Sequence, residues 1–378
     1  MKKILFIVSE DWYFVSHRLH LAQTAISQGY DVTLLTNVDA HKTLIEENGI
    51  NVISWSLRRN SLNPLKEIQS ILQVIKTIQL IKPSLIHSVA LKPILYSAIA
   101  SMITSVKCRV FAFAGLGYVF TSHKLLARLF RIPISLSIRF LLKNDYSSII
   151  LQNQDDVSIL LNLNIIKKDS VELIPGSGVD INLFFPQKIQ NEHSIPIVML
   201  PARLLWDKGI GDFVLAAKIL KDCDIKARFV LVGQPDLHNP ASISDGQISE
   251  WVDSEIIEYW GFKKNMSEIL NQSTIICLPS YREGFPKVLL EAASCGKPIV
   301  TTDVPGCRQA IQNNISGFLV PPNNPKALSR ALEKLILDQS LCKKMGKEGL
   351  KRVRLELSQE IIAKQTISLW ERILARYY

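Results

Sequence analysis

The stretch Glu283-Gly-Phe-Pro-Lys-Val-Leu-Leu-Glu291 carries two carboxylates eight positions apart. The apolar run at residues 273–280 has the length of a short buried strand. We therefore expect Glu283 on a strand-to-helix loop and Glu291 about two turns into the helix. Unpaired N–H groups and a positive dipole end make such a helix N-terminus suitable for a diphosphate, with the carboxylates accepting hydroxyl groups around it. A helix with a charged, solvent-exposed face also carries Glu at this spacing, so the stretch alone leaves both interpretations open.

A second polar cluster lies upstream, in the run Ile195-Pro-Ile-Val-Met-Leu-Pro-Ala-Arg-Leu-Leu-Trp-Asp-Lys-Gly209. The apolar part predicts a strand that ends at Ala202, with Arg203 and Lys208 on the loop that follows. Parallel strands bring their carboxyl ends to one edge of a sheet, where α/β proteins bind ligands. Two cations at this edge, facing a helix N-terminus, form a clamp for a pyrophosphate. Ordinary solvated loop cations are the alternative interpretation.

The two motifs together resemble the R-x4-KG and E-x7-E motifs of family 4 retaining glycosyltransferases (glycosyltransferase group 1). That family has the GT-B fold, in which two Rossmann-like domains face a cleft. The resemblance spans nearly the whole chain. It implies that Arg203 and Lys208 contact the leaving diphosphate and that Glu283 orients the donor sugar. The nucleotide-sugar site that it implies comprises Arg203, Lys208, Glu283, Gly284, Phe285, Lys287, Val288 and Glu291.

The resemblance also implies a reaction. We expect transfer of a hexose or N-acetylhexosamine, with retention, from a UDP-linked donor to a lipid-linked saccharide. Residues 16–22 match the SHR-L-x-L-A wording of a branch that builds surface polysaccharides and lipid-linked oligosaccharides. We expect no cofactor and no metal, because the chain has no Asp-x-Asp-type motif at a strand end. A nucleotide-sugar epimerase of the related two-Rossmann type and a non-enzymatic protein of the membrane surface remain alternatives.

Strand-like and helix-like apolar runs alternate along the chain, which predicts an α/β fold with parallel sheets. The strand pattern restarts near residue 196 after a linker rich in proline and glycine. We expect a first domain at residues 1–180 that faces acceptor and membrane, and a nucleotide-sugar-binding domain at residues 181–355. In the family that this chain resembles, a C-terminal helix, here residues 356–378, crosses back onto the first domain.

Positive charge is concentrated in the first part of the chain. The net charge is +10, and residues 1–145 hold 17 Lys or Arg against 8 Asp or Glu. This imbalance predicts an anionic partner, and without a recognised nucleic-acid module we expect lipid headgroups or a diphosphate-bearing acceptor. Residues 124–143 combine leucines with five cations and no acid, which suits the surface of an anionic bilayer. An ordinary helix with solvated cations is the alternative.

Targeting and redox features indicate a cytoplasmic protein, peripheral on the inner face of the cell membrane. The apolar residues 4–8 are too short for a signal-peptide core, and the uncharged stretch at residues 93–106 is too short for a membrane span. Six cysteines show no CxxC pair, so we expect reduced and mostly buried thiols.

The first domain offers further cleft or acceptor candidates. His17 and Arg18 are expected to open the first helix and face the cleft, or to be ordinary polar residues of its first turn. Gly115 and Gly117 allow close backbone approach to a ligand, and Tyr118 can stack on an acceptor; a glycine turn with core aromatics is the alternative. Many relatives carry a histidine where this chain has Ala114. The nearby His87 at the end of the preceding strand is either catalytic or a core histidine, and the sequence leaves this open.

Overall fold

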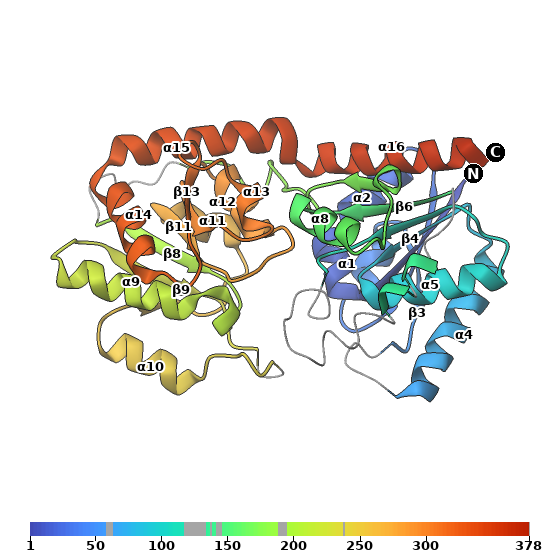
Figure 1. Cartoon of the computed structure of the whole chain (residues 1–378), viewed down its shortest axis with the longest axis horizontal. Helices are drawn as coiled ribbons and strands as arrows, with labels where there is room; N and C mark the ends of the chain where they lie inside the picture. The colour runs from blue at the N-terminus through green and yellow to red at the C-terminus, as the bar shows by residue number, and fades with distance from the viewer. Residues whose placement is uncertain are drawn as a thin grey trace. The chain divides into compact units, whose positions relative to one another are not determined.

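The structure is a computed structural model that describes residues 1–57, 63–116, 134–136, 138–140, 146–187, 195–236 and 239–377. The chain forms two compact units. Unit 1 comprises Met1–Ser177 and Gln359–Tyr378, and unit 2 comprises Gly178–Ser358. Each unit is an α/β layer structure around its own parallel sheet (Figure 1).

Unit 1 contains a parallel sheet in the order β3-β2-β1-β4-β5-β6-β7. Its strands are β1 (Lys3–Glu10), β2 (Asp31–Asn37), β3 (Asn51–Ser54), β4 (Leu85–Val89), β5 (Arg109–Ala112), β6 (Ser147–Leu151) and β7 (Val171–Leu173). Its helices include α1 (Asp11–His17), α2 (Leu19–Ser27), α3 (Lys42–Glu47), α4 (Pro64–Ile81), α5 (Leu91–Ile103), α8 (Gln154–Asn162) and α16 (Gln359–Tyr377).

The central strand β1 shows why this sheet is covered on both faces. Its residues 4–8 are all buried, as expected for a continuous apolar strand in a parallel sheet. Phe6 lies in the apolar cluster that includes residues of α2 and α16, whereas Leu5 lies in the cluster that includes residues of α4 and α5. Successive residues of a strand point to opposite faces, so one apolar run serves two helical layers.

Unit 2 repeats the plan with the strand order β10-β9-β8-β11-β12-β13. Its strands are β8 (Ile197–Pro201), β9 (Arg228–Val232), β10 (Glu258–Tyr259), β11 (Ile275–Leu278), β12 (Ile299–Thr302) and β13 (Gly317–Val320). Its helices are α9 (Ile210–Asp222), α10 (Asp245–Asp253), α11 (Met266–Gln272), α12 (Lys287–Ser294), α13 (Cys307–Ala310), α14 (Pro325–Leu337) and α15 (Gln339–Arg352). The chain then reverts to unit 1 through a π-helical turn at Val353–Leu357.

The C-terminal helix α16 belongs to the core of unit 1. Trp370 of this helix is fully buried and packs edge-on against Phe6 of β1, with 5.7 Å between ring centroids. Its indole N–H donates to His87 Nδ1 of β4 at 3.1 Å. The expected α/β fold, with two parallel-sheet units and a last helix on the first unit, is therefore confirmed.

Several local expectations were incomplete. The single helix expected at about residues 16–28 is two helices, α1 and α2, because Arg18 between them has a non-helical backbone (φ −133°, ψ −12°). His87 lies in the middle of β4 and not at its end. Helices α10 and α15 were not predicted, although each begins at a capping residue, Ser244 or Asp338, whose side chain accepts a backbone N–H.

Two further expectations concern the membrane and the thiols. Among the described residues, no helix is long and apolar enough to cross a membrane. Five of the six cysteines are buried, and only Cys223 is exposed, with no disulfide recorded for any of them.

Candidate active site

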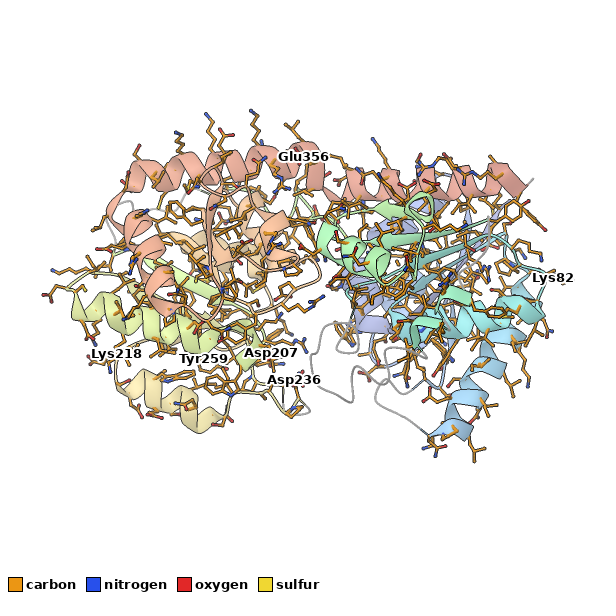
Figure 2. All side chains as sticks on the ribbon, viewed as in Figure 1. Lys82, Asp207, Lys218, Asp236, Tyr259 and Glu356 are labelled. Atoms are coloured by element: carbon orange, nitrogen blue, oxygen red, sulfur yellow. The ribbon has the colours of Figure 1, made fainter. Side chains whose placement is uncertain are left out.

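The first wall of the candidate site is the loop that follows β8 in unit 2. Arg203 leaves the strand end with its side chain 60% exposed, and its Nη1 lies 2.9 Å from Oδ2 of Asp236. Asp236 follows β9 and projects from the same sheet edge as Asp207 (Figure 2). The backbone bond from Leu204 N to Gln234 O, 3.0 Å long, holds the two loops together. The guanidinium of Arg203 is thus held at the rim of the unit 2 sheet.

Lys208 is positioned by the glycine that follows it. The short 3₁₀ turn Trp206–Lys208 ends at Gly209, which has φ +71° and begins α9. A Cβ at this position would lie 2.0 Å from the carbonyl oxygen of Pro279, so no other residue allows so close an approach. The bond from Tyr281 N to Asp207 O, 2.9 Å long, closes the same contact. The Lys208 loop therefore packs directly on the loop that follows β11.

Glu283 lies on that second loop and is largely buried. Its Oε1 forms an ion pair with Lys208 Nζ and accepts a hydrogen bond from Ser280 Oγ at 2.7 Å. The side chains of Glu283 and Lys208 are only 13% and 20% exposed. The strand-to-helix placement of Glu283 agrees with the sequence, whereas its pairing with Lys208 was not foreseen.

A third loop supports the backbone of Glu283. Glu283 N donates to the carbonyl oxygen of Pro305 at 3.3 Å. The next residue, Gly306, has φ +81°, and a Cβ there would lie 2.7 Å from Glu283 O and 2.5 Å from Gly284 O. Because both neighbours are backbone atoms, only glycine fits, and the loop between β12 and α13 fixes the course of the acidic motif.

Helix α12 supplies the remaining candidates. It begins at Lys287 after Pro286, which provides no side-chain cap for the first N–H groups. Glu291 lies about one turn into α12, not two, and its Oε1 is 3.5 Å from Nζ of Lys287. Burial raises the pKa of the Glu291 carboxyl, and the Lys287 ammonium opposes that rise.

These loops enclose a cavity of about 200 Å³ within unit 2. It is lined by Pro201, Ala202, Arg203, Lys208, Leu278, Glu283, Pro286, Lys287 and Val288. Five of the eight residues expected at a nucleotide-sugar site therefore share one cavity. Gly284 and Phe285 lie on the adjoining loop, and Phe285 packs partly against the core. Glu291, on α12, is not among the residues that line the cavity.

A polar pair that was not predicted from the sequence, Asp212 and Tyr281, lies next to these loops. Asp212, in the first turn of α9, has its carboxyl pKa raised by burial, against hydrogen bonds from the backbone of Asn323 and the hydroxyl of Tyr281. Tyr281 stands two residues before Glu283, so this pair ties α9 to the acidic motif. An aspartate in a helix's first turn is too common to have indicated this role.

The unit 1 candidates occupy different surroundings. His17 ends α1, and its ring stacks on that of Tyr13 at 4.3 Å between centroids. Arg18 is buried and lies between α1 and α2. The expectation that this pair opens the first helix was therefore wrong, because the pair lies at the end of α1. Gly115 follows β5 with φ +138°. Gly117 and Tyr118 lie outside the described residues.

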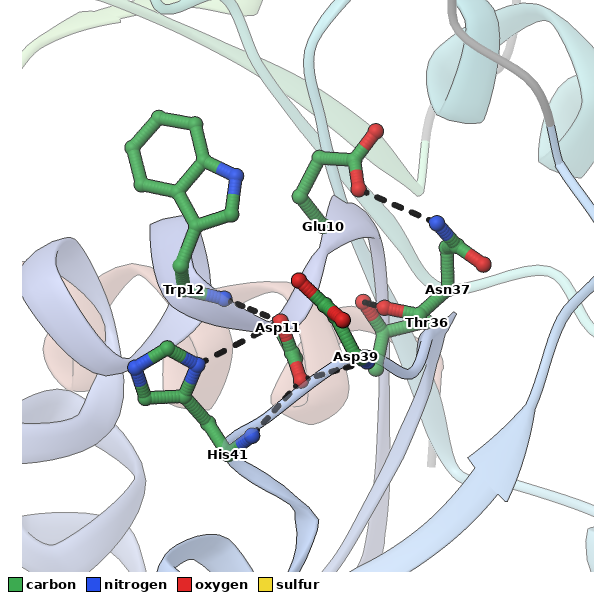
Figure 3. A network of polar contacts seen from close by, with 7 residues as sticks. All are labelled: Glu10, Asp11, Trp12, Thr36, Asn37, Asp39 and His41. Carbon is green, nitrogen blue, oxygen red and sulfur yellow. Dashed lines mark hydrogen bonds and ion pairs between the residues drawn. The ribbon is translucent and has the colours of Figure 1, made fainter.

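The end of β1 carries a buried carboxylate that the sequence analysis did not single out. Asp11 accepts the backbone N–H groups of Trp12, Asp39 and His41 at 2.6, 2.8 and 2.9 Å (Figure 3). Burial acts to raise the pKa of the Asp11 carboxyl, but these three donors and the His41 ring together hold it below its ordinary value. Asp11 therefore anchors the loop after β2. Because its oxygens already accept these hydrogen bonds, it is not a candidate proton acceptor.

Comparisons with known proteins cover both units. Residues 3–153 match the model of the glycosyl transferase 4-like family, and residues 183–352 match that of the glycosyl transferases group 1 family. The N,N'-diacetylbacillosaminyl-diphospho-undecaprenol alpha-1,3-N-acetylgalactosaminyltransferase of Campylobacter jejuni is 30% identical over 355 residues, which are 91% of this chain and 92% of that protein. The chain belongs to the group 1 glycosyltransferases.

Further relatives and solved structures resemble the chain more distantly. The UDP-Gal:alpha-D-GlcNAc-diphosphoundecaprenol alpha-1,3-galactosyltransferase of Escherichia coli is 23% identical over 329 residues, 83% of this chain and 82% of that enzyme. A glycosyltransferase from Rickettsia africae superposes with a TM-score of 0.81 at 20% identity over 99% of both chains. Anabaena HepE in complex with UDP gives 0.78 at 19% identity over 98% of this chain and all of HepE. These structures confirm the GT-B fold.

The part of the chain that the structure describes contains no group of three or more His, Cys, Asp or Glu side chains arranged to hold a metal ion.

Proposed function

We propose that this glycosyltransferase moves a hexose or N-acetylhexosamine from a UDP-linked donor to a lipid-linked saccharide and retains the anomeric configuration. The observation that carries the proposal is the unit 2 cavity, where Arg203, Lys208 and Lys287 converge beside Glu283. The names of the relatives from C. jejuni and E. coli, which act on diphospho-undecaprenol-linked sugars, support the acceptor class. The complex of HepE with UDP supports the nucleotide.

The three cations explain how the leaving group is stabilised. The diphosphate of a nucleotide sugar carries about two negative charges, and more charge develops on it as the glycosidic bond breaks. Lys208 is paired with Glu283 and Arg203 with Asp236, so both cations are oriented by carboxylates. A cavity of about 200 Å³ is smaller than the roughly 300–1,000 Å³ of pockets that enclose whole small ligands, so it suits the diphosphate and part of the sugar.

The carboxylates have different roles in this proposal. Glu283 lies at the cavity and, together with the backbone of Gly284 and Phe285, orients the reacting sugar. Glu291 lies one turn further along α12, where it accepts hydrogen bonds from the ribose. Unit 2 is thus the donor-binding domain, and unit 1, with its basic sequence, is the domain that meets acceptor and membrane.

Transfer is proposed to need no divalent metal, because Arg203, Lys208 and Lys287 provide the positive charge that a metal supplies elsewhere. Retention rests on the family resemblance.

The test is product analysis with the full chain, a panel of nucleotide sugars and a membrane lipid extract. Mass spectrometry should show one UDP-sugar consumed and one hexose or N-acetylhexosamine added to a lipid-linked saccharide, with full activity in excess chelator. NMR of the product should show the donor's α configuration. Formation of an isomerised donor sugar in the absence of acceptor would refute the transferase activity and indicate an epimerase instead. Activity that requires magnesium or manganese, or a β-linked product, would refute the proposed mechanism.

We further propose that the enzyme works on the cytoplasmic face of the cell membrane and binds anionic lipid through residues 124–143. Within the described part of this segment, Leu136 and Phe140 are 61% and 68% exposed beside Arg139. Arg128, Arg131 and Lys143 lie outside the described residues. Exposed apolar groups beside cations are the combination that inserts at an anionic lipid surface.

Replacing Arg128, Arg131, Arg139 and Lys143 with Gln should weaken sedimentation with anionic vesicles, while hydrolysis of a soluble donor survives. A charge-matched control replaces four exposed cations of unit 2, Lys221, Lys343, Lys344 and Lys351. Binding of the native chain should fall with salt, because surface charges are screened. Equal sedimentation with neutral and anionic vesicles, or equal loss in the control, would contradict the assignment.

A further inference from the structure

A small cavity of about 20 Å³ is lined only by residues of unit 1, none of which lines the donor cavity of unit 2. Arg18 reaches it from the junction between α1 and α2, and His87 reaches it from the middle of β4. The loop after β7 contributes Gly176 and Ser177, and α16 contributes Gln359. The cavity therefore lies where the chain leaves unit 1 after Ser177 and re-enters it at Gln359.

The cavity contains a buried cation without a counter-charge. Arg18 is 6% exposed, and its Nη1 donates to the carbonyl oxygen of His17 at 3.0 Å. Its Nε has no hydrogen-bond partner among the described residues, and none of their carboxylates forms an ion pair with it. None of the lining residues is acidic, and the next residue along α16, Glu360, does not line the cavity. A buried charge is costly unless an opposite charge compensates it.

His87 supplies a second donor to the same cavity. The indole N–H of Trp370 can only donate, so His87 Nδ1 must accept it and the ring proton must lie on Nε2. His87 is 1% exposed, and its Nε2 has no partner among the residues that the structure describes. Burial, followed by the nearby charge of Arg18, lowers the pKa of His87 well below its usual range, so the ring stays neutral.

We propose that this cavity binds one small inorganic anion of about the size of chloride, held by the Arg18 guanidinium and the His87 Nε2–H. A water molecule would satisfy the two N–H groups but would leave the charge of Arg18 uncompensated. A cavity of about 20 Å³ is only a little larger than the roughly 10–15 Å³ needed for one water molecule. This small volume limits the bound species to a small ion. The anion links the helix junction, the sheet and the start of α16. This inference is independent of the proposed reaction.

The direct test is a crystal of the full chain grown with bromide in place of chloride. An anomalous peak within hydrogen-bond distance of Arg18 and of His87 Nε2 is the expected result. A well-ordered water in the cavity with no bromide peak would overturn the proposal, whatever the behaviour of any variant.

Thermal unfolding tests whether the site is occupied at ordinary concentrations. The melting temperature should rise with chloride, and not with gluconate at equal ionic strength, because a ligand of the native state stabilises it in proportion to the logarithm of its concentration. Arg18→Met should abolish the difference between the two salts. Arg109→Met is the matched control, because Arg109 in β5 is a similarly buried arginine of unit 1 whose Nε donates to Ser147 Oγ at 3.1 Å.

The control variant should keep the full difference between chloride and gluconate. Loss of the difference in both variants would mean that chloride acts on the overall positive charge of the protein, which contradicts a specific site. A bromide peak without any chloride effect on melting of the native chain would mean an adventitious ion only, and would equally overturn the proposal.

Discussion

The ion pair between Lys208 and Glu283 makes the position of each side chain depend on the other. The Glu283 carboxylate holds the Lys208 ammonium at the cavity, and the Ser280 hydroxyl donates a hydrogen bond to the carboxylate. The sequence indicated both residues through their position at strand ends. It did not indicate their pairing, because the contact depends on the close approach of Gly209 to Pro279, which joins loops far apart in the chain. The same holds for Asp236 as the partner of Arg203.

The two glutamates should respond differently to truncation. Glu283→Ala should lower kcat by about 10²–10³-fold, the scale of losing one preorganised polar group at a reacting centre, with UDP affinity largely kept. Glu291→Ala should weaken UDP binding by roughly 10–100-fold, which corresponds to about 1.5–3 kcal/mol for a hydrogen bond to a charged group. Calorimetry with UDP and turnover assays measure both, with exposed Glu250→Ala as control. Equal loss of UDP binding in both variants would refute the assignment.

The raised pKa of Glu291 predicts a pH dependence of nucleotide binding. As pH falls from neutral toward the ordinary glutamate value of 4.5, this carboxyl becomes protonated earlier than a free one and accepts ribose hydroxyls less strongly. UDP affinity of the native enzyme should therefore fall in this range. Titration calorimetry at several pH values, with Glu291→Gln for comparison, should show that the variant lacks this component.

The sign of the linked stability change separates this effect from unfolding. Because the folded state binds the proton of Glu291 more readily than the unfolded state, this group favours folding more as pH falls through the window. Weaker UDP binding at mildly acidic pH thus cannot come from destabilisation by Glu291. An identical pH profile in Glu291→Gln would contradict the prediction.

At the scale of elements, the loop between β12 and α13 positions the acidic motif from outside it. Gly306→Ala should displace the Glu283–Gly284 backbone, because a Cβ there would lie within 2.7 Å of two carbonyl oxygens that no side-chain rotation can move. We expect a large fall in kcat together with a stability loss of about 1–3 kcal/mol. Steady-state kinetics and denaturant unfolding measure the two effects.

Gly246→Ala is the matched control, because a Cβ at Gly246 in α10 meets no atom within 4 Å. This control should leave kcat unchanged. Native turnover in Gly306→Ala would show that the loop does not constrain Glu283.

Most strands could be predicted because their apolar runs are buried on both faces, as Ile4–Val8 and Ile275–Leu278 are. The missed helices α10 and α15 are polar segments whose signal was a single cap. Ser244 with Gln247 three residues later matches a capping box and could have revealed α10. The break at Arg18 had no such signal, because it involves a buried arginine that an amphipathic pattern cannot distinguish from a solvated one. The polar residues Arg203, Lys208 and Glu283 at the strand ends of unit 2 were recognisable in the sequence. Their side-chain partners, such as Asp236 and Ser280, were not.

At the scale of the whole molecule, unit 1 depends on a helix that follows unit 2 in the sequence. Trp370 contacts aromatic rings from three segments, Phe6, Tyr30 and His87. Trp370→Ala should destabilise unit 1 by about 3–5 kcal/mol, the usual cost of deleting a fully buried aromatic ring. Hydrogen exchange should show faster opening of the β1 and β4 amides and unchanged opening of the β8 amides.

The matched control is Leu355→Ala, because Leu355 is 66% exposed. This variant should leave both sets of amides unchanged. Uniform loss of protection across both sheets in Trp370→Ala would mean that the two units unfold as one, contrary to the prediction.

The place of α16 in the chain also bears on biosynthesis. Unit 2 is one continuous segment, Gly178–Ser358, and all of its residues are synthesised before those of α16. Unit 1 begins first but cannot bury the sheet face around Phe6 until Gln359–Tyr377 emerges. Unit 2 can therefore complete its fold before unit 1 does, although it is synthesised later. Unit 1 keeps apolar surface exposed until α16 has been made. A premature stop codon between Ser177 and Gln359 leaves that surface permanently uncovered, which should direct the fragment to aggregation or proteolysis even where the donor site is complete.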